Sequence, residues 1–412
     1  MTFAPELMML PLVLSLALSA PPDPLAFTVI GTTESAPTGK LRAVSLTLGA
    51  EVATTGGSQT VPRLVALRKP NTALPPFPTG AHIITAVGDR VPGKVTGGDA
   101  KALYFTHATT DESWSIALDA VAAVWLKPPA ADTPSDPAKY TWLAGTPTRD
   151  ALLYRNGDTV RGTLTGFTAT GVKFTPDGGA ARDVPLADLA AIGFNPRFVR
   201  PRRPKGPYAG LVLTDGTRLN VNEVALKGNA LVCKAACGPA IEVPLTKLVA
   251  LNVFQGPAVY LSDLKPKKAE TVGFLGDGWA WAADRTVRGN PLFLQSGEGE
   301  ETFDKGLGTH PKTVLTYDLA GKYGRFEAVV GLDAVTGKRG LADVRIRVDG
   351  KEVPLPELKA LAAGNAIPVK VDVRGAKELA LVIDFGPAGD VQADVNWGTA
   401  RLVEQPATAL GQ

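Results

Sequence analysis

Apolar and polar residues alternate along most of this chain in short runs, and each run ends at residues that favour turns. Period-two alternation with many β-branched residues is typical of half-buried strands, and the Gly-Asp and Asp-Gly pairs between runs are typical of hairpins. Only Pro356–Ala363, with a proline at its start and Gly364 after its end, resembles a helix. The pattern predicts an all-β protein.

One pattern of strands and turns recurs along the first two thirds of the chain. Asn156–Phe194 matches Asp215–Val253 without a gap, at an offset of 59 residues. An earlier copy runs over Gly88–Leu126, and a fainter one lies within Gly39–Leu67. Each copy contains several short strands in about 45 residues, which is typical of a small SH3-like or Sm-like barrel. We therefore predict three tandem barrel-like repeats and a degenerate fourth.

After Tyr260 the repeat stops and longer alternating runs appear, joined by Gly-rich turns such as Asp349-Gly350. Many antiparallel strands in one segment of this size are typical of a β-sandwich. Proline-rich segments separate the earlier units. The predicted division is a signal peptide at 1–20, a degenerate β repeat at 27–70, a β repeat at 80–128, a Pro-rich linker at 129–150, a β repeat at 151–196, a basic Pro-rich linker at 197–208, a β repeat at 209–257 and a β-sandwich at 258–405.

The amino terminus and the cysteines both suit an oxidising compartment. Leu7–Leu18 is an apolar run followed by small residues and prolines, which is too short to span a bilayer and suits a signal-peptide core. We expect a secreted, periplasmic or cell-envelope protein with no transmembrane anchor after cleavage. Cys233 and Cys237 flank a predicted hairpin turn, so they form either a disulfide or a pair of buried thiols.

Composition narrows the function classes. The 412 residues include 44 glycines and 34 prolines, and the net charge is only +3, which gives no global attraction for nucleic acid. The basic linker carries five cations that could dock an anionic polymer, but a solvated linker is the ordinary interpretation. Three histidines and two cysteines leave little for metal or nucleophilic catalysis. No motif of a nucleophile elbow, zinc helix or phosphate loop is present.

The carboxy-terminal segment resembles a known family, the NPCBM/NEW2 domain, a carbohydrate-binding module. The motifs that carry the resemblance are Tyr260–Leu264, Gly289–Leu292, Lys305–His310, Leu315–Leu319, Tyr323–Phe326, Val330–Asp333, Val348–Lys351 and Asn396–Leu402. The resemblance implies a jelly-roll sandwich similar to modules that hold galactose-type sugars, with a structural calcium ion in some relatives. The family pattern commonly has an acid before the final tryptophan, where this chain has Asn396.

A sugar site needs an exposed aromatic face beside fixed hydrogen-bonding groups. The candidate stacking residues are Trp279, Trp281 and Trp397, and the candidate polar residues are His310, Lys312, Asp394 and Asn396. Each has a structural alternative: Trp397 lies in an apparent strand and suits the core, and His310 sits where a hydrogen bond would hold a loop. Trp279 and Trp281 follow a Gly-rich turn, which favours exposure.

Loop acids could bind calcium, which takes oxygen ligands. They are Glu298, Glu300, Glu301, Asp384, Asp390 and Asp394. No spaced calcium motif accompanies them, so solvated acids are the ordinary interpretation and we predict no other cofactor.

The function predicted from the sequence is non-catalytic glycan binding by the sandwich, with the repeats as a scaffold. One alternative is a structural or protein-interaction component of the envelope, with other envelope proteins as partners. A second is an accessory chain of a glycoside-degrading system or a degenerate hydrolase. The hydrolase would show a pocket with two carboxylates and a raised pKa on one of them.

Overall fold

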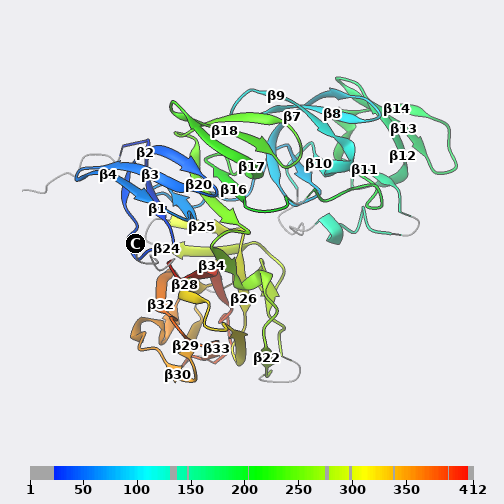
Figure 1. Ribbon diagram of the computed structural model, residues 1–412. Helices are drawn as coiled ribbons and strands as arrows, with labels where there is room; N and C mark the ends of the chain where they lie inside the picture. Colours follow the sequence, from blue (N-terminus) through cyan, green and yellow to red (C-terminus); the bar gives the residue numbers. More distant parts are fainter. Residues whose placement is uncertain are drawn as a thin grey trace, which may run out of the picture.

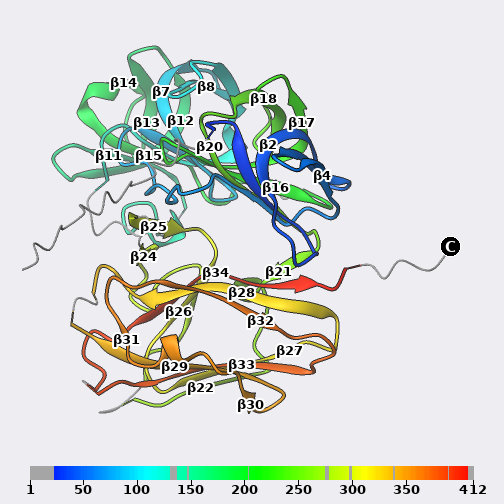
Figure 2. The ribbon, with the colours of Figure 1, turned by 90° about the vertical axis from the view of Figure 1, so that its left-hand side faces the viewer.

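The computed structural model describes residues 23–129, 137–145, 148–202, 204–273, 278–296, 299–336, 339–387 and 389–406. The predicted all-β fold class is confirmed, because these residues form strands joined by turns and by 3-10 helical segments. The predicted signal peptide lies outside the described residues. Figures 1 and 2 show two lobes, one made by the amino-terminal repeats and one by the carboxy-terminal sandwich.

The repeat region contains units of five strands. Unit 1 consists of β1 (Ala26–Ile30), β2 (Thr38–Ser45), β3 (Gly49–Thr54), β4 (Gly57–Val61) and β5 (Ala66–Arg68). Unit 2 consists of β6 (His82–Thr85), β7 (Arg90–Gly98), β8 (Ala102–His107), β9 (Ser113–Ala117) and β10 (Val121–Trp125). Unit 3 consists of β11 (Asp150–Tyr154), β12 (Thr159–Phe167), β13 (Gly171–Pro176), β14 (Arg182–Pro185) and β15 (Leu189–Gly193). Unit 4 consists of β16 (Tyr208–Leu213), β17 (Arg218–Lys227), β18 (Ala230–Ala235), β19 (Ala240–Pro244) and β20 (Leu248–Phe254).

All of these units share one strand order. The first strand lies between the second and the fifth, and the second, third and fourth strands form an antiparallel meander. The second strand carries a bulge in every unit, for example between Val95 and Gly97 in β7 and between Leu164 and Gly166 in β12. A bulge bends and twists its strand, so this strand can curve around a small core. The SH3-like or Sm-like class stays a prediction.

Strands also pair between units. β10 pairs with β15, β5 pairs with β20, and β7 pairs with β17 where Arg90 lies opposite Arg218. All twenty strands therefore belong to one hydrogen-bonded network, and one cluster of buried apolar residues extends through every unit, from Phe27 to Val253. The repeats form one body rather than separate beads.

Of the two states expected for Cys233 and Cys237, the structure has the second, because both cysteines are buried free thiols. Cys233 lies on β18 opposite Ile241 of β19, whereas Cys237 lies in the turn between these strands. The hairpin register thus places an isoleucine, not the second cysteine, across from Cys233. Burial raises the pKa of both thiols to about 12.

The basic linker is docked on unit 2. The backbone N–H of Arg200 donates to the Asp119 carbonyl at 2.6 Å, and the Arg202 side chain pairs with the Asp119 carboxylate at 2.6 Å. Arg203 lies outside the described residues. The linker therefore contributes to packing between units.

The carboxy-terminal lobe is a two-sheet sandwich, as predicted. One sheet has the order β23 (Ala282–Ala283), β26 (Gly306–Thr309), β34 (Val395–Glu404), β28 (Tyr323–Leu332) and β32 (Ile367–Asp372), with β21 (Ala258–Tyr260) beside β34. The other has the order β22 (Lys268–Thr271), β27 (Thr313–Asp318), β33 (Glu378–Phe385), β29 (Leu341–Val348) and β30 (Lys351–Glu352), with β31 (Leu361–Ala362) beside β29. A separate hairpin joins β24 (Leu292–Ser296) and β25 (Gly299–Phe303).

The predicted helix at Pro356–Ala363 is wrong. This segment contains only a 3-10 turn, η5 (Pro356–Leu358), followed by β31. Buried Leu358 and Leu361 anchor both pieces in the sandwich core, so packing rather than helix propensity decides the local structure.

The two lobes are joined by buried polar contacts. Arg325 of β28 donates to the carbonyls of Gly31 at 2.6 Å and Thr32 at 2.8 Å in the repeat region. Arg218 of β17 binds both carboxylate oxygens of Asp304 at 2.7 and 2.8 Å. A shared apolar cluster lies beside them: Leu74, Val212, Val249 and Ala250 from the repeats, with Leu292, Leu294 and Phe303 from the hairpin. The sandwich is thus held in a fixed position on the repeats.

Candidate functional site

Three neighbouring strands of one sandwich sheet have an end at the same end of the sheet. Thr309 of β26 lies opposite Val395 of β34, and Leu332 of β28 also lies opposite Val395. The ends of β26 and β28 and the start of β34 are therefore neighbours. At this end of the sheet His310 follows β26, Asp333 follows β28, and Asp394 precedes β34.

A tight turn over Thr286–Asn290 brings an arginine to this end of the sheet. The Thr286 N–H donates to the Asn290 carbonyl at 2.9 Å, and the Asn290 N–H donates to Thr286 Oγ1 at 3.2 Å. Gly289 has a φ of +87°, a left-handed conformation that glycine adopts without strain. The turn therefore presents Arg288, whose side chain is 41% exposed.

Trp279 provides an exposed aromatic surface next to that arginine. Its relative exposure is 45%. The His310 ring is nearly parallel to it, with 6.1 Å between centroids and 24° between planes. The guanidinium carbon of Arg288 lies 4.9 Å from the centroid of the indole ring, within the range of a cation–π contact.

Asp394 is the central acceptor. Its side chain is only 2% exposed, and Arg288 Nε donates to Oδ2 at 2.8 Å. His310 Nε2 lies 3.8 Å from Oδ1, and Thr336 Oγ1 lies 3.4 Å from Oδ2. These contacts hold the carboxylate in one position, so Arg288 and His310 are in turn held beside the tryptophan.

A second buried carboxyl supports Asp394 from behind. The Asp333 N–H donates to the Asp394 carbonyl at 2.9 Å, and Thr336 Oγ1 lies 3.1 Å from Asp333 Oδ2. Burial raises the pKa of Asp333, and hydrogen bonds from Val335 and Thr336 oppose that change. We call Trp279, Arg288, His310 and Asp394, with Asp333 and Thr336 behind them, the Trp279 site.

The Trp279 site combines the two requirements of sugar recognition. The indole face suits the C–H face of a pyranose, because both surfaces are apolar and flat. Arg288 supplies N–H donors and His310 supplies a ring nitrogen, and the buried Asp394 holds Arg288 in position. The arrangement can therefore bind a sugar by stacking and by hydrogen bonds.

Three of the seven sugar-contact candidates thus come together: Trp279, His310 and Asp394. Lys312 does not join them, because its ammonium pairs with Asp384 at 2.7 Å and lies 5.0 Å from the centroid of the Phe385 ring. Trp281 is half-buried and packs against the sandwich core.

Two further candidates are inside the sandwich. Trp397 is 0% exposed, and its Nε1–H donates to Thr309 Oγ1 at 3.2 Å. Asn396 is also 0% exposed, and its Nδ2 donates to the Phe293 carbonyl at 3.2 Å. The prediction that both contact sugar is wrong for this structure, because Trp397 packs in the sandwich core and Asn396, on the opposite face of β34, lies against β24.

No prediction from the sequence named Arg288, Asp333 or Thr336. Arg288 immediately precedes a quoted family motif, Gly289–Leu292, which is a signal for a structured turn. Asp333 is the last residue of another family motif, Val330–Asp333, so its position at the end of a strand could be predicted from the sequence. Nothing in the sequence marks Thr336.

The loop acids do not form a calcium site in the part of the chain that the structure describes. Glu301 is buried and pairs with Arg68, and it also accepts from the Leu74 N–H at 3.1 Å. Asp384 pairs with Lys312 and Arg345, and Glu298 lies outside the described residues. No group of three or more acidic, histidine or cysteine side chains is placed among the described residues to hold a metal ion. These residues therefore do not fit the calcium that the resemblance implies.

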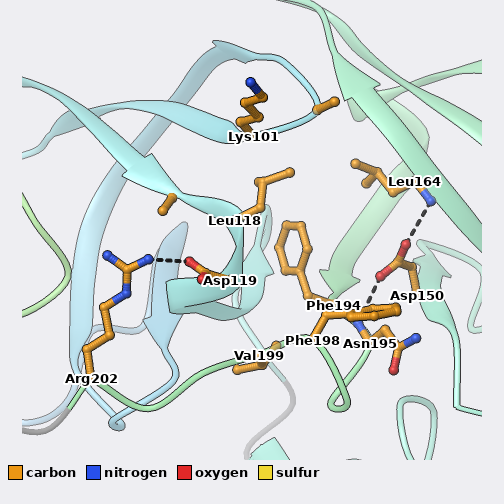
Figure 3. Close-up of a pocket in the computed structure, with 12 residues that line it drawn as sticks. Lys101, Leu118, Asp119, Asp150, Leu164, Phe194, Asn195, Phe198, Val199 and Arg202 are labelled. Atoms are coloured by element: carbon orange, nitrogen blue, oxygen red, sulfur yellow. Dashed lines mark hydrogen bonds and ion pairs between the residues drawn. The ribbon is translucent and has the colours of Figure 1, made fainter.

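A cavity of about 450 Å³ between units 2 and 3 contains two carboxylates, as the hydrolase alternative requires. Figure 3 shows that both are engaged. Asp119 pairs with Arg202 at 2.6 Å, and Asp150 accepts from the backbone N–H groups of Leu164 and Asn195, each at 2.8 Å. Burial raises the pKa of Asp150. The cavity therefore has both features that the hydrolase alternative predicts, and both acids also bind other parts of the chain.

The comparisons with known proteins concern mainly the sandwich. The family model of the NPCBM/NEW2 domain matches residues 257–403, which confirms the resemblance. A curated relative from Renibacterium salmoninarum, named "Putative endo-alpha-N-acetylgalactosaminidase", is 30% identical over 152 residues. That match covers 35% of this chain and 9% of the relative, so the chain spans less than a tenth of the relative's length.

Two similar solved structures are carbohydrate-binding modules of Clostridium perfringens. The CBM51 module of a GH95 protein, in complex with methyl-galactose, is 29% identical with a TM-score of 0.32, covering 35% of this chain and 99% of that one. A ZmpB structure containing CBM51-2 in complex with GlcNAc and INT domains is 24% identical with a TM-score of 0.33, covering 45% of this chain and 40% of that one.

None of the helical segments among the described residues is long and apolar enough to cross a bilayer.

Proposed function

We propose that this protein binds glycans through the Trp279 site of its sandwich. The observation that carries the proposal is the 45% exposure of Trp279 beside a buried carboxylate, which binds Arg288 at 2.8 Å and lies 3.8 Å from His310. The match of residues 257–403 to a carbohydrate-binding family supports the same function. The exposure of Trp279 favours sugar binding over the alternative of an envelope component without sugar affinity, which would bury all three candidate tryptophans.

The ligand is a terminal or internal hexose with one apolar face. Stacking on Trp279 selects for that face, and a hydroxyl on the adjacent carbon reaches Arg288, which the buried Asp394 holds in place. Because Arg288 and Asp394 neutralise each other, the site suits an uncharged sugar. Recognition is reversible and non-catalytic.

The repeat region serves as a rigid scaffold in this proposal. Buried contacts at Arg218 and Arg325 fix the sandwich on the repeats, so the sugar site has a defined orientation relative to whatever the repeats contact. We propose that the protein works outside the cytoplasm, as a secreted or envelope protein or as an accessory chain in glycoside degradation. The apolar run Leu7–Leu18 supports export.

A glycan array probed with the full chain tests the proposal. We expect binding to neutral glycans with terminal hexoses, and a loss of at least tenfold in apparent affinity for Trp279→Ala. The matched control is Tyr104→Ala, which removes another exposed aromatic side chain (42% exposed) from unit 2. Equal binding by wild type and Trp279→Ala, or binding to no glycan by the folded chain, would contradict the proposal.

A further inference from the structure

A second cavity lies where units 2 and 4 meet the sandwich. Its volume is about 810 Å³, within the range of small-molecule sites, which occur preferentially between domains. Its walls include Asp89, Asn220, Asn252 and Phe254 of the repeats, with Tyr260 and Lys305 of the sandwich. We call it the interlobe cleft.

One wall of the interlobe cleft is aromatic. The rings of Tyr208 and Phe254 are 5.1 Å apart, and those of Phe254 and Tyr260 are 5.4 Å apart. Phe254 lies against the strand at Gly210, where a Cβ atom would come within 2.8 Å of its ring. The absence of a side chain at this position therefore lets the phenyl ring pack close to the sheet.

The repeat side also provides hydrogen-bonding groups. Asp89 Oδ1 accepts from the Asn220 N–H at 2.9 Å and from Asn220 Nδ2 at 2.7 Å. Asp89 Oδ2 is buried and has no hydrogen-bond partner among the described residues. A buried polar atom without a partner is costly, so this oxygen favours a ligand group that supplies one. Asn252 adds an amide to the same wall.

Five of the charged residues that line the interlobe cleft are paired with each other, and Arg90 and Arg285 also line it. Lys305 lies between Asp263 and Asp284, at 2.6 Å from each, and Asp304 is bound by Arg218. A charged ligand would have to displace one of these partners. A wholly apolar ligand would leave the carboxyl oxygen of Asp89 without a partner.

We propose that the interlobe cleft is a second binding site, specific for a neutral, hydroxyl-rich ligand of oligosaccharide size. The aromatic wall receives the C–H faces of pyranose rings, and Asp89 and Asn252 receive hydroxyl groups. This site goes beyond the proposed function, because it lies in the junction between the lobes and shares no residue with the Trp279 site. One chain would then hold two stretches of glycan.

The test uses the full chain carrying Trp279→Ala, which silences the sandwich site. Maltotriose, cellotriose and chitotriose are titrated into it by calorimetry. We expect one of these neutral trisaccharides to bind at one site per chain. Adding Asn252→Trp, which fills the cleft, should weaken that binding at least tenfold. The matched control is Asn229→Trp, at an exposed turn of the same unit, and it should have no effect.

A second variant covers the case in which Asn252→Trp does not fold. Asp89→Asn keeps the shape of the side chain and, at pH 8, where the Asp89 carboxyl is ionised, replaces an acceptor with a donor, so it should weaken the same binding at least threefold at that pH. The proposal is overturned if no trisaccharide binds to the Trp279→Ala chain, or if the folded cleft variants bind as well as their control. It is also overturned if a trimer of hexuronic acid or a short neutral peptide binds in the cleft and the neutral trisaccharides do not. These outcomes are separate from the Trp279 proposal, which depends on the difference between wild type and Trp279→Ala.

Discussion

The two lobes use the same kinds of side chain for different purposes. In the repeats, His107 is buried, stacks on Trp114 with 5.0 Å between centroids, and lies 3.3 Å from Thr217 Oγ1 of another unit. In the sandwich, His310 stacks on Trp279, which is exposed. The histidine–tryptophan pair is thus an internal contact in one lobe and part of an open surface in the other.

The reason lies in what covers each strand end. The repeat units cover one another, since strands pair between units. Their polar groups form hydrogen bonds between units, such as that of Asp89 with Asn220. The sandwich has one neighbour, the repeat region, and it meets that neighbour through Arg325 and the β24–β25 hairpin. The Trp279 site lies at the end of the sandwich sheet where β26 and β28 end, and the repeats do not supply its residues. Function is therefore expected where polar side chains are fixed by neighbours and still reach solvent.

The largest expected effect concerns the contact between the lobes. Arg325→Ala should lower the free energy of unfolding by about 3–5 kcal/mol, because it leaves buried carbonyls of Gly31 and Thr32 without donors and removes a partner of Glu327. Chemical denaturation measures this change. The matched control is Arg374→Ala, whose ion pair with Asp372 is exposed and should contribute little to stability. Equal losses in the two variants would show that the lobes are not fixed by this contact.

The next effect concerns the buried link between units 2 and 4. Burial raises the pKa of Asp89 from 3.8 to about 7, so the folded state holds a proton that the unfolded state has released between these pH values. The stability contribution of Asp89 should therefore fall as pH rises from about 4 to 7. Relative to wild type, Asp89→Asn should gain at most about 4 kcal/mol over that range.

The difference between variant and wild type is the quantity to measure, because His82 titrates in the same range. Burial lowers the pKa of His82 to about 4, so its own contribution increases with pH. Urea denaturation at pH 4, 6 and 8 gives the difference. Asp158→Asn, at the equivalent and exposed position of unit 3, should show no such change. A pH-independent difference for Asp89→Asn would mean that this carboxyl is not desolvated.

The smallest expected effect separates two cations of the sandwich. Arg288→Ala should weaken glycan binding about tenfold, or about 1.4 kcal/mol, because it removes the partner of Asp394 and the contact with Trp279. Lys312→Ala should change affinity less than twofold, since Lys312 pairs with Asp384 away from the site. Calorimetry with the glycan found on the array measures both. A larger loss of glycan affinity for Lys312→Ala than for Arg288→Ala would show that the glycan binds near Lys312 and not at the Trp279 site.

Local patterns predicted the strands well and the assembly poorly. Alternation and turn dipeptides depend only on neighbouring residues, so the strands of the repeats and of the sandwich could be predicted from the sequence. Pairing of β10 with β15 or of β5 with β20 depends on apolar edges that meet only in the folded chain. The helix expected at Pro356–Ala363 failed for the same reason, because burial of Leu358 and Leu361 overrides local propensity.

The site was predicted in part. Trp279, His310 and Asp394 carry residue types that sugar recognition uses, and their motifs marked them. Asn396 and Trp397 share those types and lie two and three residues from Asp394 in the sequence. Their burial and contacts show that they point into the protein, because Trp397 lies in the sandwich core and Asn396 donates to the Phe293 carbonyl. Residue type therefore identified candidates, and the fold decided which of them lie beside the exposed Trp279.

The central claim is that sugar contacts Trp279 and no buried tryptophan. The chain has six tryptophans, and their indole N–H resonances can be followed by ¹H–¹⁵N NMR of the tryptophan-labelled full chain during titration with the glycan found on the array. We predict a saturable shift of the Trp279 resonance, with those of Trp114 and Trp397 unchanged. Saturable binding that leaves the Trp279 resonance in place would contradict the account.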